Sequence, residues 1–182
     1  HPVPFGPEDW QRHHALQFAK VLEPLGIALA GEAPLFPLCD ADRRAASDAM
    51  ARHGLEPGRF AVFHIAASKA PRAWHAERFA AVASALEAGR GFRPVLVGGP
   101  SDAPVHALFR EGCPSALDLA GTLTLRGSAA LTERCGIFVG SDSGPMHIAA
   151  AVGAKVVAVF GPGSPAKTAP PVPAERLRVV YA

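Results

Sequence analysis

The sequence has 182 residues, 49% of them hydrophobic and 19% charged, which is enough for one well-covered core. A formal net charge of +2 gives no reason to expect a nucleic acid partner, and no apolar run is long enough to span a bilayer. Three widely spaced cysteines without a Cys-x-x-Cys pair argue against a disulfide framework or a zinc site and favour a reducing cytosol. Because the chain begins with His1 and has no charged, apolar leader, we expect no signal peptide and expect it to be part of a longer protein.

Apolar periodicity, punctuated by glycine and proline, predicts helices that alternate with strands. Helices are expected over residues 10–23, 40–53 (capped by Asp40), 75–87, 103–111, 125–134 and 145–152. Strands are expected over residues 59–67, 93–98, 117–119, 137–140, 155–160 and 177–181. The proline-bearing stretches 27–38 and 162–173 indicate an extended connector and an ordered loop or crossover. The alternation predicts an α/β fold, a Rossmann-like parallel sheet with helices on both faces.

Ligands of such sheets bind at the carboxyl ends of the strands. The loops that leave those ends should therefore converge on one cleft, although they are far apart in the sequence. These loops are residues 66–74, 98–102, 121–125, 140–147 and 161–165.

The stretch 136–165 predicts an anion site, because its residues are typical of a strand, a polar turn, a helix and a second strand. Pro145 suits the first helical position, and Gly144 lets a ligand approach the backbone closely. The unpaired N–H groups there lie at the positive end of the helix dipole, and we interpret the anion as the diphosphate of a sugar nucleotide. A carboxylate would repel that diphosphate, so Asp142 should accept hydrogen bonds from sugar hydroxyls or from the helix N–H groups. A plain helix cap by Asp142 or Ser143 explains the turn equally well.

Further candidate residues each have a structural alternative. His147 could donate a hydrogen bond to a sugar or phosphate oxygen, or it could pack half-buried on the sheet. Ser68, Lys69 and Arg72 follow a strand end and could neutralise a departing diphosphate. Alternatively, they belong to a solvated basic loop in which Trp74 only covers the start of the next helix.

Two other positions could contact a nucleoside. Asp102 could bind a ribose hydroxyl or cap the helix that follows it. Residues 123–125 offer an apolar shelf that suits a flat base, although core packing explains them equally well. The sequence has no metal ligands at recognisable spacing, no Walker A loop and no Gly-x-Ser-x-Gly elbow, so neither a metal nor a cofactor is expected.

Several motifs together resemble one family. The run FVGSDSGPMHIAAAVGAKVVAVFGPGSP is similar to the signature of the lipopolysaccharide heptosyltransferases, glycosyltransferase family 9. Upstream, AASKAPRAWHAERFAAVASAL, VLVGGPSD and DLAGTLTLRGSAAL resemble further motifs of that family in the same order. The resemblance covers about residues 60–170.

The resemblance implies the C-terminal domain of a GT-B glycosyltransferase. Residues 39–182 would bind the nucleotide-sugar donor, and residues 1–38 would be the end of the N-terminal half and the interdomain connector. The implied activity is inverting, metal-independent transfer of a heptose-type sugar from ADP-heptose to a lipopolysaccharide-core acceptor, in the cytoplasm with peripheral contact to the inner membrane. A missing N-terminal domain would hold the acceptor and the general base, so this chain alone should bind donor weakly and transfer nothing.

The resemblance also implies roles for individual residues. The catalytic residues would be Arg72 and Asp142. Arg72, at a position where the family usually has lysine, would contact the diphosphate, and Asp142 would face the sugar. Donor-binding roles are implied for Ser68, Lys69, Asp102, Leu125, Ser143, Gly144, Pro145 and His147. Of these, Asp102 would face the ribose and Leu125 the base. A sugar-nucleotide epimerase of similar fold, for which Asp142 and His147 are the acid/base candidates, or a non-catalytic nucleotide-sugar binding domain is the alternative.

Overall fold

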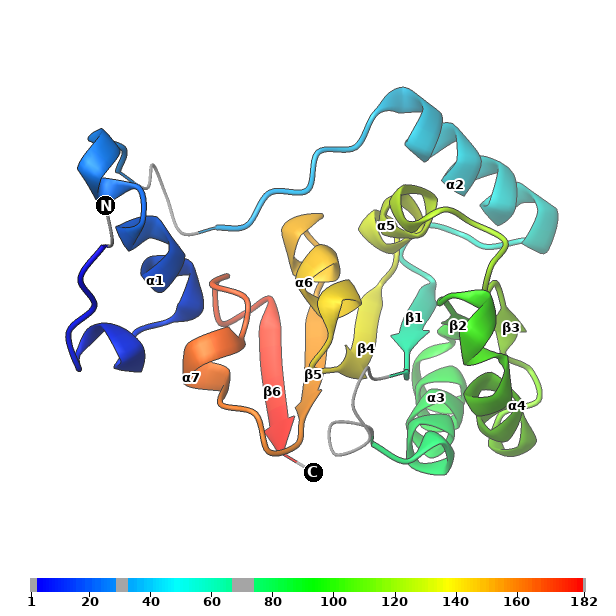
Figure 1. The fold of residues 1–182 in the computed structure, drawn as a ribbon. Coiled ribbons are helices and arrows are strands. Elements are labelled where there is room, and N and C mark those ends of the chain that lie inside the picture. The colour runs from blue at the N-terminus through cyan, green and yellow to red at the C-terminus, as the bar shows by residue number, and fades with distance from the viewer. Residues whose placement is uncertain (1–2, 29–32, 67–73, 182) are drawn as a thin grey trace.

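A parallel sheet forms the centre of the molecule, whose computed structural model describes residues 3–28, 33–66 and 74–181 (Figure 1). Within these ranges the sheet has six strands in the order β3-β2-β1-β4-β5-β6, and every neighbouring pair is parallel. The strands are β1 (Phe60–His64), β2 (Arg93–Leu96), β3 (Leu117–Asp118), β4 (Ile137–Ser141), β5 (Val156–Phe160) and β6 (Leu177–Tyr181). The predicted Rossmann-like parallel sheet is therefore confirmed, although β1 is shorter than expected.

Helices cover both faces of this sheet, as the sequence predicts (Figure 1). They are α2 (Asp40–His53), α3 (Ala76–Arg90), α4 (Ala103–Gly112), α5 (Leu125–Glu133) and α6 (Gly144–Ala151). Helices α2, α5 and α6 pack on one face, and α3 and α4 pack on the other. The expected crossover before β6 contains a further short helix, α7 (Pro165–Thr168). None of the described helices is long and apolar enough to cross a membrane.

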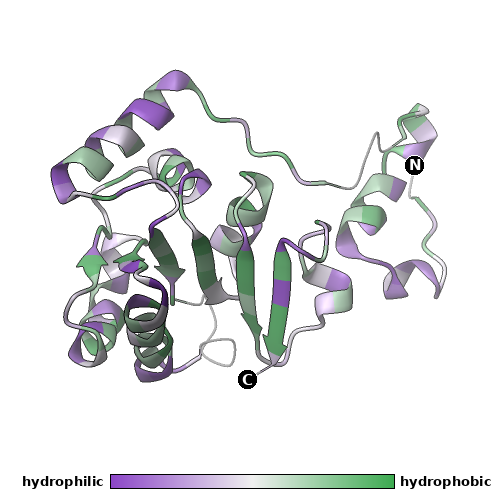
Figure 2. Ribbon diagram, turned by 180° about the vertical axis from the view of Figure 1, so that it is seen from behind, coloured by the Kyte–Doolittle hydropathy of each residue, from purple (hydrophilic) through white to green (hydrophobic). Residues whose placement is uncertain are grey.

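The strands are apolar along both faces because each face carries a layer of helices. In β1, Phe60 and Val62 belong to the core beneath α2, α5 and α6, whereas Ala61 and Phe63 belong to the core beneath α3 and α4. All four side chains are fully buried, as expected for a parallel sheet that is covered on both sides. Figure 2 shows the hydrophobic strands at the centre and hydrophilic residues concentrated on the surrounding helices.

Local chemistry sets the bounds of α2. The helix occupies the predicted residues 40–53, and Gly54 ends it with a φ of +61° that favours glycine. The predicted cap is wrong by one position, because Cys39 is the N-cap residue and Asp40 is the first helical residue. The Asp42 carboxylate accepts a hydrogen bond from the Cys39 N–H at 2.8 Å. In a capping box this contact requires only the backbone of the N-cap residue, so a cysteine can occupy that position.

The N-terminal segment differs from the single helix predicted over residues 10–23. It consists of a 3₁₀ turn (Asp9–Gln11), helix α1 (His14–Lys20) and a second 3₁₀ turn (Glu23–Leu25). The buried Asp9 carboxylate pairs with Lys20, and Arg12 is extended with a ψ of 162°, so the first turn cannot continue into α1. A new helix then begins because His13 accepts a hydrogen bond from the second residue of α1.

A hydrogen bond joins this segment to the rest of the chain. Nε2 of His13 donates to the carbonyl of Ala169, just after α7, at 2.7 Å. Residues 27–28 and 33–39 form neither helix nor strand, as the predicted connector requires. Figure 1 shows α1 next to α7 at the β6 edge of the sheet.

The core between the sheet and α4 should be sensitive to loss of volume at Phe109. This ring is fully buried, and its centroid lies 5.4 Å from the centroid of the Phe63 ring. We expect Phe109→Ala to lower the free energy of unfolding by about 3–5 kcal/mol, measured by urea denaturation. Leu108, which precedes it on the helix and is 45% exposed, is the matched control, and Leu108→Ala should change stability by less than about 0.5 kcal/mol. Equal losses in the two variants would contradict this description of the core.

Candidate functional site

Two adjoining pockets lie where the strand order reverses, between β1 and β4. The first, called here the apolar pocket, has a volume of about 360 Å³ and is lined mainly by aliphatic, aromatic and glycine residues. The second, called here the polar pocket, has a volume of about 670 Å³ and carries carboxylates, hydroxyls and imidazoles. His64 and Pro145 line both pockets, so the two form one continuous cleft. Loops leaving β1, β2, β3 and β4 meet there, as predicted.

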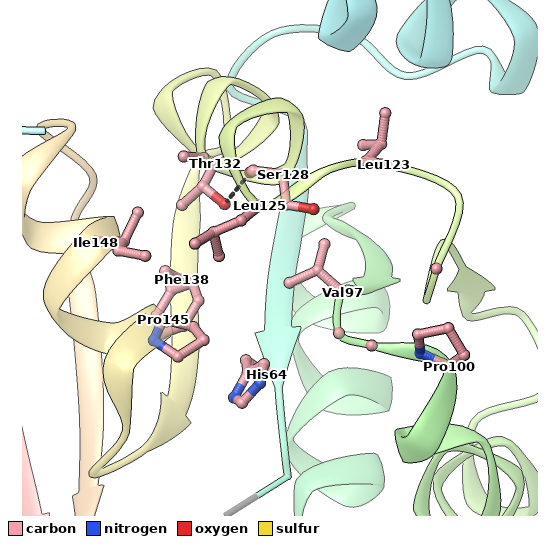
Figure 3. Close-up of a pocket in the computed structure, with 14 residues that line it drawn as sticks. His64, Val97, Pro100, Leu123, Leu125, Ser128, Thr132, Phe138, Pro145 and Ile148 are labelled. Atoms are coloured by element: carbon pink, nitrogen blue, oxygen red, sulfur yellow. Dashed lines mark hydrogen bonds between the residues drawn. The ribbon is translucent and has the colours of Figure 1, made fainter. Parts of the chain in front are cut away.

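The apolar pocket lies over β1 and β4 and is bounded by α5 and α6 (Figure 3). The ring of Phe138 on β4 forms part of its wall. Leu123, from the connection between β3 and α5, and Leu125, the first residue of α5, also line it. The predicted apolar shelf therefore lines a pocket, and Leu125 is 60% exposed at its edge. Thr124 places the shelf, because its hydroxyl accepts from the Gly127 N–H at 3.0 Å and so starts α5.

The start of α6 faces the polar pocket. Ser143 is the N-cap residue, Pro145 is in the first turn, and Gly144 is exposed with open space where a Cβ would be. The Ser143 side chain does not cap the helix; its hydroxyl lies 3.3 Å from Nδ1 of His64. The alternative in which the Ser143 side chain is only a cap is therefore wrong, and the first N–H groups of α6 remain at the positive end of its dipole.

Asp142 also lines the polar pocket, although its side chain is largely buried. Its N–H donates to the carbonyl of Val159 at 3.1 Å and so continues the pairing of β4 with β5. A Cβ at Gly163 would lie 2.9 Å from Asp142 Oδ2, so glycine is needed there for the loop to pass the carboxylate. Residues 161–165 line neither of the two pockets, contrary to the prediction, whereas Thr168 on α7 lines the polar pocket.

His147 lies half-buried in the polar pocket, on the first turns of α6. Burial lowers the pKa of its imidazole, Asp142 opposes that shift, and the nearby His13 adds to it. The ring is thus held neutral near pH 7, a state in which one ring nitrogen donates and the other accepts. This position suits the predicted donor role, which stays a prediction.

Asp102 also lines the polar pocket. It is the last residue of the 3₁₀ turn Pro100–Asp102, which leads into α4. Its carboxylate accepts a hydrogen bond from the Gly99 N–H at 2.8 Å, and its side chain does not cap α4. The capping alternative therefore holds for the start of the 3₁₀ turn that runs into α4, although not for α4 itself. Because a Cβ at Gly98 would lie 2.4 Å from Asp102 Oδ2, glycine at that position lets the carboxylate fold back over the turn.

His64 is a site residue that the sequence analysis missed. It is the last residue of β1, is 9% exposed, and lies between the two pockets (Figure 3). Burial lowers the pKa of its imidazole, with a smaller opposing effect from Asp102. The available signal was a single polar residue within the apolar run FAVFHIAA, at the end from which the first loop leaves.

Three predicted site residues, Ser68, Lys69 and Arg72, lie outside the described residues. On the two sides of this loop, Ala66 lines the polar pocket, and Trp74 packs edge-on against Phe79 with ring centroids 4.8 Å apart. Trp74 therefore covers the start of α3, which confirms the alternative interpretation of this residue. In the described part of the chain, no three His, Cys, Asp or Glu side chains are grouped closely enough to hold a metal ion.

Acidification should destabilise the fold through His64 and His147. Burial holds the pKa of both imidazoles below the ordinary value of 6.5, so at lower pH the unfolded chain binds protons that the folded chain does not. The free energy of unfolding should therefore fall as the pH drops below about 6.5, and these two groups should have no effect above it. In urea denaturation at a series of pH values, the double variant His64→Gln/His147→Gln should lose less stability on acidification than the wild type. An unchanged slope would show that neither histidine is buried as described.

Comparison with known proteins relates this chain to a family. The model of Glycosyltransferase family 9 (heptosyltransferase) matches residues 1–180. Lipopolysaccharide heptosyltransferase 3 of Escherichia coli is 37% identical over 94 residues, which are 50% of this chain and 27% of that protein. The crystal structure of a family 9 glycosyl transferase from Veillonella parvula has a TM-score of 0.85 and 28% identity, covering 100% of this chain and 51% of that one. An Escherichia coli heptosyltransferase solved with ADP has a TM-score of 0.57 and 26% identity, covering 74% of this chain and 41% of that one.

The chain spans about half the length of the Veillonella structure, and the match covers about a quarter of the curated relative. The family model nevertheless covers almost every residue present here. As its motifs predict, the chain belongs to glycosyltransferase family 9, the heptosyltransferase family.

Proposed function

We propose that this chain is the donor-binding half of an inverting heptosyltransferase. The donor would be ADP-heptose and the acceptor a lipopolysaccharide core. Three findings support the proposal: membership of the family, the name of the Escherichia coli lipopolysaccharide heptosyltransferase that it resembles, and ADP in a solved relative.

The observation that carries the proposal is the junction of an apolar pocket with a polar one beside a helix N-terminus. A nucleotide sugar has the same succession of groups: a flat base, then an anionic diphosphate, then a polyhydroxylated sugar. The base would occupy the apolar pocket against Leu125, and the diphosphate would lie at the N–H groups of Ser143 and Gly144. Asp102 and Asp142 would then accept hydrogen bonds from ribose and sugar hydroxyls, since carboxylates do not bind phosphate.

Transfer would proceed by attack of an acceptor hydroxyl, deprotonated by a base, on the anomeric carbon of the donor. The bond to the diphosphate breaks in the same displacement, and negative charge develops on the leaving group. The start of α6, with Lys69 and Arg72 of the loop after β1, would stabilise that charge in place of a metal ion. Neutral His147 would donate a hydrogen bond to a phosphate or sugar oxygen, and Asp142 would orient the sugar.

The complete enzyme would have two halves, of which this chain contains the donor-binding one. Residues 1–38 would be the end of the N-terminal half and the connector, and residues 39–182 the donor-binding domain. The acceptor and the general base would be held by an N-terminal domain, at the cytoplasmic face of the inner membrane. The bond from His13 to the Ala169 carbonyl supports a fixed attachment of the first segment to the donor-binding domain.

The nucleobase can be tested by calorimetry with ADP, UDP and GDP on the 182-residue chain. We expect ADP to bind at least about tenfold more tightly than the other two, a difference of about 1.4 kcal/mol. A preference for UDP or GDP would reject ADP-heptose as the donor while leaving the family unchanged.

The proposed contact of Arg72, in the loop after β1, with the diphosphate can be tested with Arg72→Ala. Loss of a charge-assisted hydrogen bond of about 1.5–3 kcal/mol should weaken ADP binding by roughly ten- to a hundredfold and leave adenosine binding unchanged. Arg44→Ala, an exposed position on α2, is the matched control and should bind ADP as the wild type does. Equal weakening of ADP and adenosine in Arg72→Ala would mean that the loop is structural.

A further inference from the structure

His64 occupies the junction of the cleft. It is the last residue of β1, pairs in register with Gly140 of β4, and lines both pockets together with Pro145. A Cβ at Gly140 would lie 2.8 Å from the His64 carbonyl, so glycine lets the two strands approach closely at this point. The imidazole is thereby held on the sheet, beside the start of α6.

Local rules do not explain His64 or its partner. The four residues before it in β1 are apolar and fully buried, and burying an imidazole among such residues costs free energy that an apolar side chain would not. Ser143 is at an N-cap position, where a serine usually accepts from its own helix, but its hydroxyl lies 3.3 Å from Nδ1 of His64. Two departures that converge on one point of a cleft indicate a functional contact.

The tautomer of His64 determines what the ring can offer to a ligand. When Nδ1 accepts from the Ser143 hydroxyl, the proton of the neutral imidazole is on Nε2. Burial favours this neutral form. A ring held through Nδ1 presents Nε2–H as a donor, and Figure 3 shows the ring at the edge of the apolar pocket, between Pro145 and Pro100.

We propose that His64 binds the donor nucleotide at the phosphate attached to the ribose, with Nε2–H donating to a phosphate oxygen and Nδ1 held by Ser143. This inference rests on the proposed function, because it requires a nucleoside diphosphate that spans both pockets. A phosphate lying between a base in the apolar pocket and a sugar in the polar pocket would pass the junction that His64 lines. Ser143 would contribute its backbone N–H to the diphosphate and its hydroxyl to the imidazole.

Two amide variants separate the ring nitrogens. The amide nitrogen of His64→Gln can replace Nε2, whereas the shorter His64→Asn can replace only Nδ1. By calorimetry, we expect His64→Asn to bind ADP about tenfold more weakly than the wild type and His64→Gln to bind within about threefold of it. Adenosine, which has no phosphate, should bind the wild type and both variants alike.

Controls separate this contact from an effect on folding. The melting temperatures of the two amide variants should agree, and His53→Asn at the end of α2 should bind ADP as the wild type does. Equal ADP affinities of His64→Asn and the wild type, or parallel losses of ADP and adenosine, would overturn the inference alone. A wild-type chain that does not bind ADP would overturn the proposed function and this inference with it.

Discussion

The cleft depends on the reversal of strand order between β1 and β4. From β1 the chain adds β2 and β3 on one side, and from β4 it adds β5 and β6 on the other. Connections that leave two such strands diverge to opposite sides, so the carboxyl ends open into a crevice. The close pairing of Gly140 with His64 fixes this crevice, because any side chain at Gly140 would meet the His64 carbonyl. The other features of the site therefore depend on the parallel pairing of β1 with β4.

Charge is distributed across this crevice in a consistent way. The start of α6 supplies unpaired N–H groups, and burial holds His64 and His147 neutral, so this side offers hydrogen-bond donors. Asp102 faces it from the turn after β2, with its carboxylate held by the Gly99 N–H. The arrangement fits a ligand with an anionic middle and hydroxyls on either side better than it fits a simple anion, because carboxylates near a bare phosphate would weaken binding.

Sequence alone predicted those parts of the fold that local residues determine. The bounds of α2 and β6 were correct, since glycine, apolar alternation and polar flanks mark their ends. The helix expected over residues 10–23 was wrong because Asp9 pairs with Lys20 across the turn, a contact that periodicity does not show. For His64 the local pattern offers only a polar residue in an apolar run, and its position beside Ser143 follows from the pairing of β1 with β4.

The same geometry indicates where an acceptor base would act. In an inverting displacement the base works on the face of the sugar opposite the leaving group. The start of α6, the loop after β1 and the two carboxylates all leave the same edge of the sheet, so they would surround the donor from one side. Asp102 is held by the Gly99 N–H, and Asp142 is largely buried beside Gly163, so neither is placed to reach around the sugar. A second surface that faces this edge is therefore where we expect the base, and the cleft described here would supply binding and leaving-group stabilisation.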